Sequence, residues 1–153
     1  MDHQQPEGLN LNSVFTANLP ELFKRFNISL AVSTYQAGKL IILRNQDNKI
    51  NTHFRNFQRP MGIAVKPNRL TIGCKRSIEY YHNVPATIAK LENPDAYDAC
   101  YIPRLSHNTG AIDIHEMSYG SDNQLWVVNT RFSTLCTIDF DNSFVPRWHP
   151  HFI

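Results

Sequence analysis

Cysteine, long apolar runs and targeting signals are all scarce or absent in this 153-residue sequence, and each absence excludes a class of protein. The three cysteines (Cys74, Cys100 and Cys136) are too few and too far apart for a disulfide framework. No apolar run approaches the roughly 20 residues that cross a bilayer, and the N-terminus lacks the basic and apolar segments of a secretory signal. The sequence therefore predicts a cytoplasmic protein without a membrane partner.

Clustered charge and nucleotide motifs are missing as well. The 15 Lys and Arg residues are scattered, and the net charge is only +2, so the sequence offers no basic stripe for nucleic acid. There is no glycine-rich phosphate loop, no Gly-x-Ser-x-Gly elbow and no paired-cysteine metal site. With 42% hydrophobic residues, 18% charged residues and nine prolines, the composition is typical of one soluble domain built from strands and loops.

Apolar spacing predicts one short helix followed by many short strands. We expect residues 1–15 to be flexible and a helix to run from Pro20 to Phe26, capped by Thr16 or Asn18. From residue 29 onward, β-rich segments alternate with polar turns. The predicted strands are 30–35, 40–43, 50–54, 63–65, 70–72, 78–81, 112–114, 125–128 and 135–138.

Two segments of equal length repeat one pattern. Residues 30–40 and 125–135 each read as strand, polar turn and strand, and a related unit lies between them. We therefore divide a single domain, residues 16–153, into blade-like units at 29–57, 59–83 and 111–141, with an irregular insert at 84–107. The spacing is typical of propeller blades, so we predict an all-β, partial β-propeller of about three meander blades. A plain meander or a sandwich is the alternative.

Three blades would form an open arc, whereas propellers close with about four to eight. An arc leaves unpaired strand edges, which favour aggregation. We therefore expect the chain to be the N-terminal half of a longer propeller whose C-terminal half is missing.

Seven segments carry a resemblance to a known family: 32–41, 59–64, 101–104, 107–110, 113–115, 128–133 and 143–148. In order and wording they resemble a bacterial family of conserved hypothetical proteins, a domain of unknown function sometimes found beside tetratricopeptide repeats. The resemblance implies a propeller of about twice this length and brings no established activity. Ala111 and Thr134 depart from the acid and the cysteine that the family tends to carry there, which implies a weakened site. Residues 59–64 are also similar to inner blade strands of lactonase-like propellers, where such segments end at a central metal.

Two histidines and an aspartate suggest a metal site. Asp113 and His115 lie two residues apart, so on a strand they would share a face, and the Thr109–Gly110 turn could return His107 to them. Two imidazoles and a carboxylate suit a divalent metal that activates water. The alternative is that these side chains only tie down loops through hydrogen bonds.

Arginines suggest a second kind of site. Arg59, Arg104 and Arg131 each lie beside a strand start or a turn, and three converging guanidiniums would bind an anion. They could instead bridge blades. Asn129 precedes Arg131 and would either face a ligand or form the turn between two strands. Aromatic residues such as Trp126 could stack on sugar rings or fill the core.

Two functions follow, and a third reading has no small-molecule site. We expect a binding module for a small anionic or sugar-like ligand or a protein partner, or alternatively a metal-dependent hydrolase or lactonase. A scaffold becomes the better interpretation if the side chains of residues 107–116 are buried and satisfied. Cys74 and Cys136 are expected to be buried, inert thiols.

Overall fold

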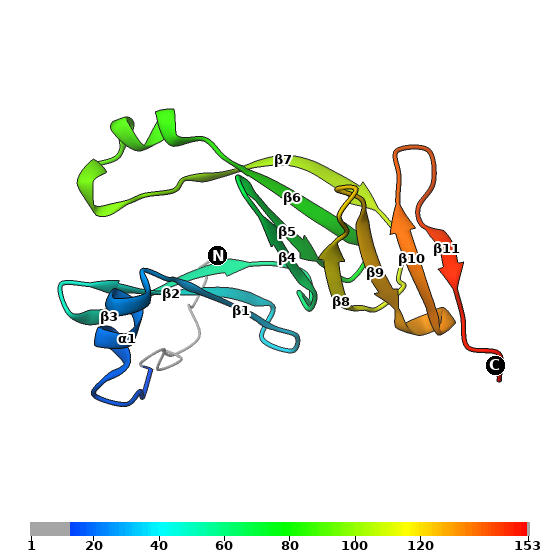
Figure 1. Ribbon diagram of the computed structural model, residues 1–153, viewed down its shortest axis with the longest axis horizontal. Helices are drawn as coiled ribbons and strands as arrows, with labels where there is room; N and C mark the ends of the chain where they lie inside the picture. Colours follow the sequence, from blue (N-terminus) through cyan, green and yellow to red (C-terminus); the bar gives the residue numbers. More distant parts are fainter. Residues whose placement is uncertain (1–12, 153) are drawn as a thin grey trace, which may run out of the picture.

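Three antiparallel sheets and one short α-helix make up the protein in the computed structural model, which describes residues 13–152 (Figure 1). Residues 1–12 of the segment predicted to be flexible lie outside the described residues. Within the described part, no helix is both long and apolar enough to cross a membrane.

The helix lies where the sequence predicts it. Helix α1 (Leu19–Phe26) has Pro20 in its first turn and ends at Asn27, whose left-handed backbone (φ 51°) lets its N–H reach the carbonyl of Lys24. Asn18 occupies the N-cap position, although its side chain makes no capping hydrogen bond. Phe23 is buried, and the helix packs against β2 and β3.

Sheet A contains β1 (Leu30–Thr34), β2 (Lys39–Gln46) and β3 (Lys49–Asn56), in that order. The β1–β2 turn depends on Gly38, which has a left-handed backbone (φ 61°). A Cβ atom at Gly38 would lie 2.9 Å from the carbonyl oxygen of Phe57. All three strands of sheet A lie within residues 29–57.

Sheet B contains β4 (Ile63–Lys66), β5 (Arg69–Gly73), β6 (Ser77–Asn83) and β7 (Tyr101–Asn108). The predicted unit ended at residue 83, so the fourth strand was missed. Strand β7 falls inside the stretch predicted to be an irregular insert. The insert is in fact shorter, and it holds the 3₁₀ turns η1 (Pro85–Lys90) and η2 (Pro94–Ala96). Pro103 obscured the strand in the sequence, but proline is tolerated because β7 is an edge strand.

Sheet C contains β8 (Ile114–Tyr119), β9 (Leu125–Asn129), β10 (Thr134–Ile138) and β11 (Val145–Trp148). The 3₁₀ turn η3 (Thr130–Phe132) joins β9 to β10. The predicted strand at 112–114 is wrong, since Asp113 has a left-handed backbone (φ 51°) and the strand begins only at Ile114. Strand β11 lies beyond the predicted end of the unit at residue 141.

Sheet B is the central layer and is buried on both faces. Leu70 and Ile72 of β5 pack with Leu40 of sheet A, whereas Ala64 and Ile78 pack with sheet C. The sheet C side of this second core consists of Ile112, Ile114, Met117, Leu125, Val127 and Cys136. Burial on both faces explains why β5 is buried almost continuously instead of alternating.

The first strands of sheets B and C lie against each other. Strands β4 and β8 are in contact, and the N–H of Gly62 donates to the carbonyl of Ile114 at 3.1 Å. The predicted fold class, all-β with meander blades and one short N-terminal helix, is confirmed. The described residues form no closed barrel.

Candidate functional site

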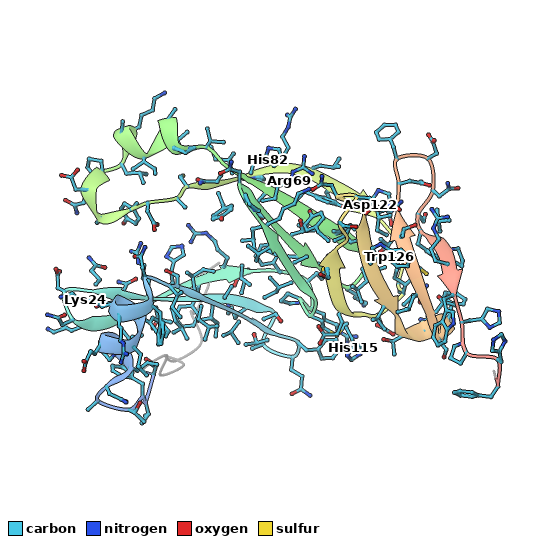
Figure 2. The ribbon with its side chains drawn as sticks, viewed as in Figure 1. Lys24, Arg69, His82, His115, Asp122 and Trp126 are labelled. Carbon is cyan, nitrogen blue, oxygen red and sulfur yellow. The ribbon has the colours of Figure 1, made fainter. Side chains whose placement is uncertain are left out.

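An open hollow of about 520 Å³ lies where β1 ends and where β4 and β8 begin. Figure 2 shows His115 at the lower edge of the sheets, whereas Arg69 and Asp122 lie toward their upper edge. Sheet A, the connection into sheet B, and sheet C all contribute to the hollow. Its lining residues are Ser33, Tyr35, Pro60, Met61, His115 and Glu116.

Backbone hydrogen bonds fix the floor of the hollow. The N–H of Met61 donates to the carbonyl of Gly73 (2.9 Å), and the N–H of Gly73 donates to the carbonyl of Gly62 (2.8 Å). Pro60 is fully buried beside them. This connection between β3 and β4 is therefore held against β5, and through Gly62 it is also held against β8.

Ser33 and Tyr35 form the side of the hollow that belongs to sheet A. The Ser33 hydroxyl donates to the Met61 carbonyl at 2.5 Å, which joins the end of β1 to the floor. Thr34 steadies the next turn, since its Oγ1 accepts from the N–H of Lys39 at 3.0 Å. Tyr35, in that turn, is exposed at the rim.

Arg59 stands beside Tyr35. Its Nη1 donates to Tyr35 Oη at 3.2 Å, and its guanidinium carbon lies 5.4 Å from the centre of the Tyr35 ring. The Arg59 backbone is left-handed (φ 48°), a conformation that costs a non-glycine residue roughly 1–2 kcal/mol. Such strain persists only where the surrounding structure enforces it, and it clusters at functional sites.

The structure does not bring the three predicted metal ligands, His107, Asp113 and His115, together as one site. His107 lies on β7, where its Nε2 is 3.0 Å from the carbonyl oxygen of Ser143. His115 is exposed on β8, but Asp113 precedes that strand and has a left-handed backbone, so the strand alternation used to pair them does not reach it. Among residues 13–152, no three His, Cys, Asp or Glu side chains gather as metal ligands.

The three arginines predicted to converge on an anion lie in different segments of the fold. Arg59 lies at the rim of the hollow, Arg104 is exposed on β7, and Arg131 is exposed in η3. The backbone N–H of Arg131 donates to the carbonyl of Ile112 at 3.3 Å. Of the three, the structure brings Arg59 to the hollow.

Asn129 forms the turn, one of the two roles proposed from the sequence. It is fully buried, and its Oδ1 accepts from the N–H of Phe132 at 3.2 Å. Its Nδ2 lies 3.8 Å from the sulfur of Cys136. The amide thus caps η3 and is used by the fold itself.

Sequence reasoning missed Ser33, Tyr35, Met61 and Glu116. Ser33, Tyr35 and Met61 lie in segments that carry the family resemblance, 32–41 and 59–64, which was the available signal. The sequence does not show that the end of β1 lies beside the starts of β4 and β8. His115 and Glu116 are exposed, so the condition set for a pure scaffold is not met there.

Buried titratable groups lie in the core. Burial, followed by the nearby Glu79 carboxylate, raises the pKa of the Cys74 thiol to about 12. Burial also raises the pKa of Tyr80. Cys74 and Cys136 are both buried, as predicted, and the high pKa suits an unreactive Cys74 thiol.

A second hollow of about 230 Å³ lies on sheet C and is mostly apolar. Trp126, Val128 and Leu135 line it together with Glu116, Met117, Ser118 and Val127. Its lining comes from one sheet, in contrast to the larger hollow.

Comparison with known families identifies the family of this chain. The model of a family described as Domain of unknown function (DUF4915) matches residues 17–153. No curated protein matches the chain.

Proposed function

Because the chain belongs to the DUF4915 family, whose description assigns no activity, we propose a function from the hollow: a module that binds a small, anionic, sugar-like ligand. The observation that carries the proposal is that sheet A, the connection into sheet B, and sheet C line this hollow together. Binding sites lie preferentially in such concave junctions, where a few polar groups converge over an apolar base.

The lining complements hydroxyl groups. The Ser33 hydroxyl donates to Met61 but keeps free lone pairs, and the Tyr35 hydroxyl accepts from Arg59 while its own proton stays available. The Glu116 carboxylate is exposed in the lining and accepts hydrogen bonds from ligand hydroxyls. Met61 supplies an apolar contact for the carbon face of a sugar ring, and the buried Pro60 lies beside it.

Arg59 supports an anionic group on the ligand. Its guanidinium lies at the rim, and charge-assisted hydrogen bonds to a carboxylate are stronger than neutral ones. His115 on β8 adds a second nitrogen-bearing side chain that can hydrogen-bond to the bound molecule. A sugar acid combines the ring hydroxyls and the carboxylate that this set of groups recognises.

We also propose that residues 16–153 form one unit in which the three sheets are successive blades around an axis. The meander order of each sheet and the contact between the first strands β4 and β8 support this arrangement. The hollow then corresponds to the mouth of the channel, where propellers commonly bind ligands.

Calorimetric titration with D-glucuronate, D-glucose and acetate tests the proposal. D-Glucose has the ring hydroxyls but no carboxylate, and acetate has the carboxylate but no ring hydroxyls. We expect saturable binding of D-glucuronate and weaker binding of the other two. Arg59→Gly should weaken D-glucuronate binding about tenfold or more, the loss of one charge-assisted hydrogen bond. Glycine also accepts the left-handed backbone, so this variant should remain folded.

Arg104→Ala is the matched control, since it removes an exposed guanidinium on β7 away from the lining. It should bind D-glucuronate as the wild-type chain does. Equal binding by Arg59→Gly and wild-type protein, or no binding of D-glucuronate to either, would contradict the proposal.

A further inference from the structure

Sheet A lacks a counterpart of the first strand of sheet C. Residues 30–40 align with 125–135, and the ninth position of each segment, Gly38 and Ser133, has a left-handed backbone (φ 61° and 50°). Strand β1 therefore corresponds to β9, which is the second strand of its sheet and pairs with β8. Within residues 13–152, β1 pairs with β2 alone.

A strand added at the free edge of β1 can be compared in direction with β4 and β8, the first strands of sheets B and C. Strand β1 ends beside the residues that precede β4 and beside the start of β8. A strand added antiparallel to β1 would therefore run in the same direction as β4 and β8. It would give sheet A the four strands that sheets B and C already have.

Two apolar side chains of β1, and one just before it, are exposed to solvent. Leu30 is 47% exposed and Val32 is 36% exposed, and Ile28, just before the strand, is 50% exposed. Helix α1 packs mainly on β2 and β3. Exposed apolar residues gathered beside a free strand edge are typical of an interaction surface.

Among the six edge strands of the described sheets, β1 is the one without proline or a charged side chain. Proteins protect free edges with such residues against pairing with another chain. Strands β7 and β11 contain Pro and Arg, β3 contains Lys and Arg, β4 ends in Lys66, and β8 contains Glu116. The β1 edge has no comparable protection.

We propose that β1 pairs with β1 of a second copy of this chain across a twofold axis. A twofold axis perpendicular to the strands makes them antiparallel, as neighbouring strands are in all three sheets. A register centred on Ala31 places Leu30 of one copy opposite Val32 of the other. Residues 28–35 carry no charged side chain, so identical edges meet without repulsion, which favours a second copy as the occupant.

Light scattering over a series of concentrations tests the pairing. The full chain should reach twice its 17.7 kDa mass at the upper end of the series. Val32→Lys places a charge on the edge and should weaken the dimer about tenfold or more. Val65→Lys is the matched control, since Val65 is an exposed valine (62%) on β4, and it should leave the dimer intact.

Hydrogen exchange keeps the proposal testable if Val32→Lys fails to fold. In the wild-type chain, the amides of residues 30–34 should gain protection as the concentration rises, whereas those of the β11 edge, residues 145–148, should not. A monomer throughout the series, or a dimer that leaves residues 30–34 unprotected, would overturn the proposal. Protection of these amides in a monomer would overturn it too, because another segment would then occupy the edge.

Discussion

Arg59 and Asp113 both adopt a left-handed backbone; Arg59 directly precedes the lining residue Pro60, and Asp113 lies two residues before the lining residue His115. Aspartate tolerates this conformation because its short side chain can bond to the local backbone, but arginine has no such compensation. The backbone at Arg59 is held by its neighbours, since the carbonyl of Gln58 accepts from the N–H of Lys75 at 2.7 Å. An arginine at such a position is therefore a stronger sign of function than an arginine in a strand.

His53 makes the stability of the protein depend on pH. Partial loss of hydration, followed by the charges of Arg55 and Arg44, lowers its pKa below the usual 6.5. The unfolded chain thus binds this proton more readily, so stability is lost as the pH falls through 6.5 toward the folded-state pKa. The effect is small because His53 is exposed on β3.

Urea unfolding at about pH 8 and about pH 5 tests this histidine. The wild-type chain should lose more unfolding free energy between the two than His53→Gln does. In Arg55→Gln, the NMR titration of His53 should move upward, toward 6.5. Identical pH profiles for wild-type protein and His53→Gln would contradict the assignment.

At the scale of elements, turn chemistry and hydrophobic alternation predicted most of the strands. The hairpins β1–β2 and β9–β10 were recognisable because the same 11-residue pattern occurs twice. The failures have local causes: Pro103 obscured an edge strand, and the left-handed Asp113 delayed the start of β8. Of the candidate site, Arg59 and His115 were anticipated. The junction itself was not, since contacts between strand ends far apart in sequence leave no periodic signal.

Gly73 tests the packing of sheet B on sheet C. A Cβ atom there would lie 3.0 Å from Cγ2 of Ile114, which is fully buried. Gly73→Ala should lower the unfolding free energy by about 1–3 kcal/mol through overpacking. In Gly73→Ala with Ile114→Ala, the loss should be smaller than the sum of the two single losses, because the crowded methyl is gone. Additive losses, or a neutral Gly73→Ala, would contradict the packing.

At the scale of the whole molecule, the stack of sheets places its two cores on either side of sheet B. Sheets A and C each keep an outer face, and Figure 1 shows them on opposite sides of sheet B. The hollow lies between sheet A, the connection into sheet B, and sheet C, so a ligand there would contact residues from these three segments. This arrangement links the fold to the proposed function, since the hollow forms only when sheets A and C pack beside the connection into sheet B.

Chemical-shift mapping of the ¹⁵N-labelled chain during titration with D-glucuronate tests most directly whether the hollow between the sheets is the binding site. Saturable shifts should appear at the amides of Ser33, Tyr35, Met61, His115 and Glu116, which span sheets A and C and the connection into sheet B. Shifts confined to the outer face of sheet C, around Trp126 and Leu135, would contradict the assignment. The absence of any saturable shift would contradict it as well.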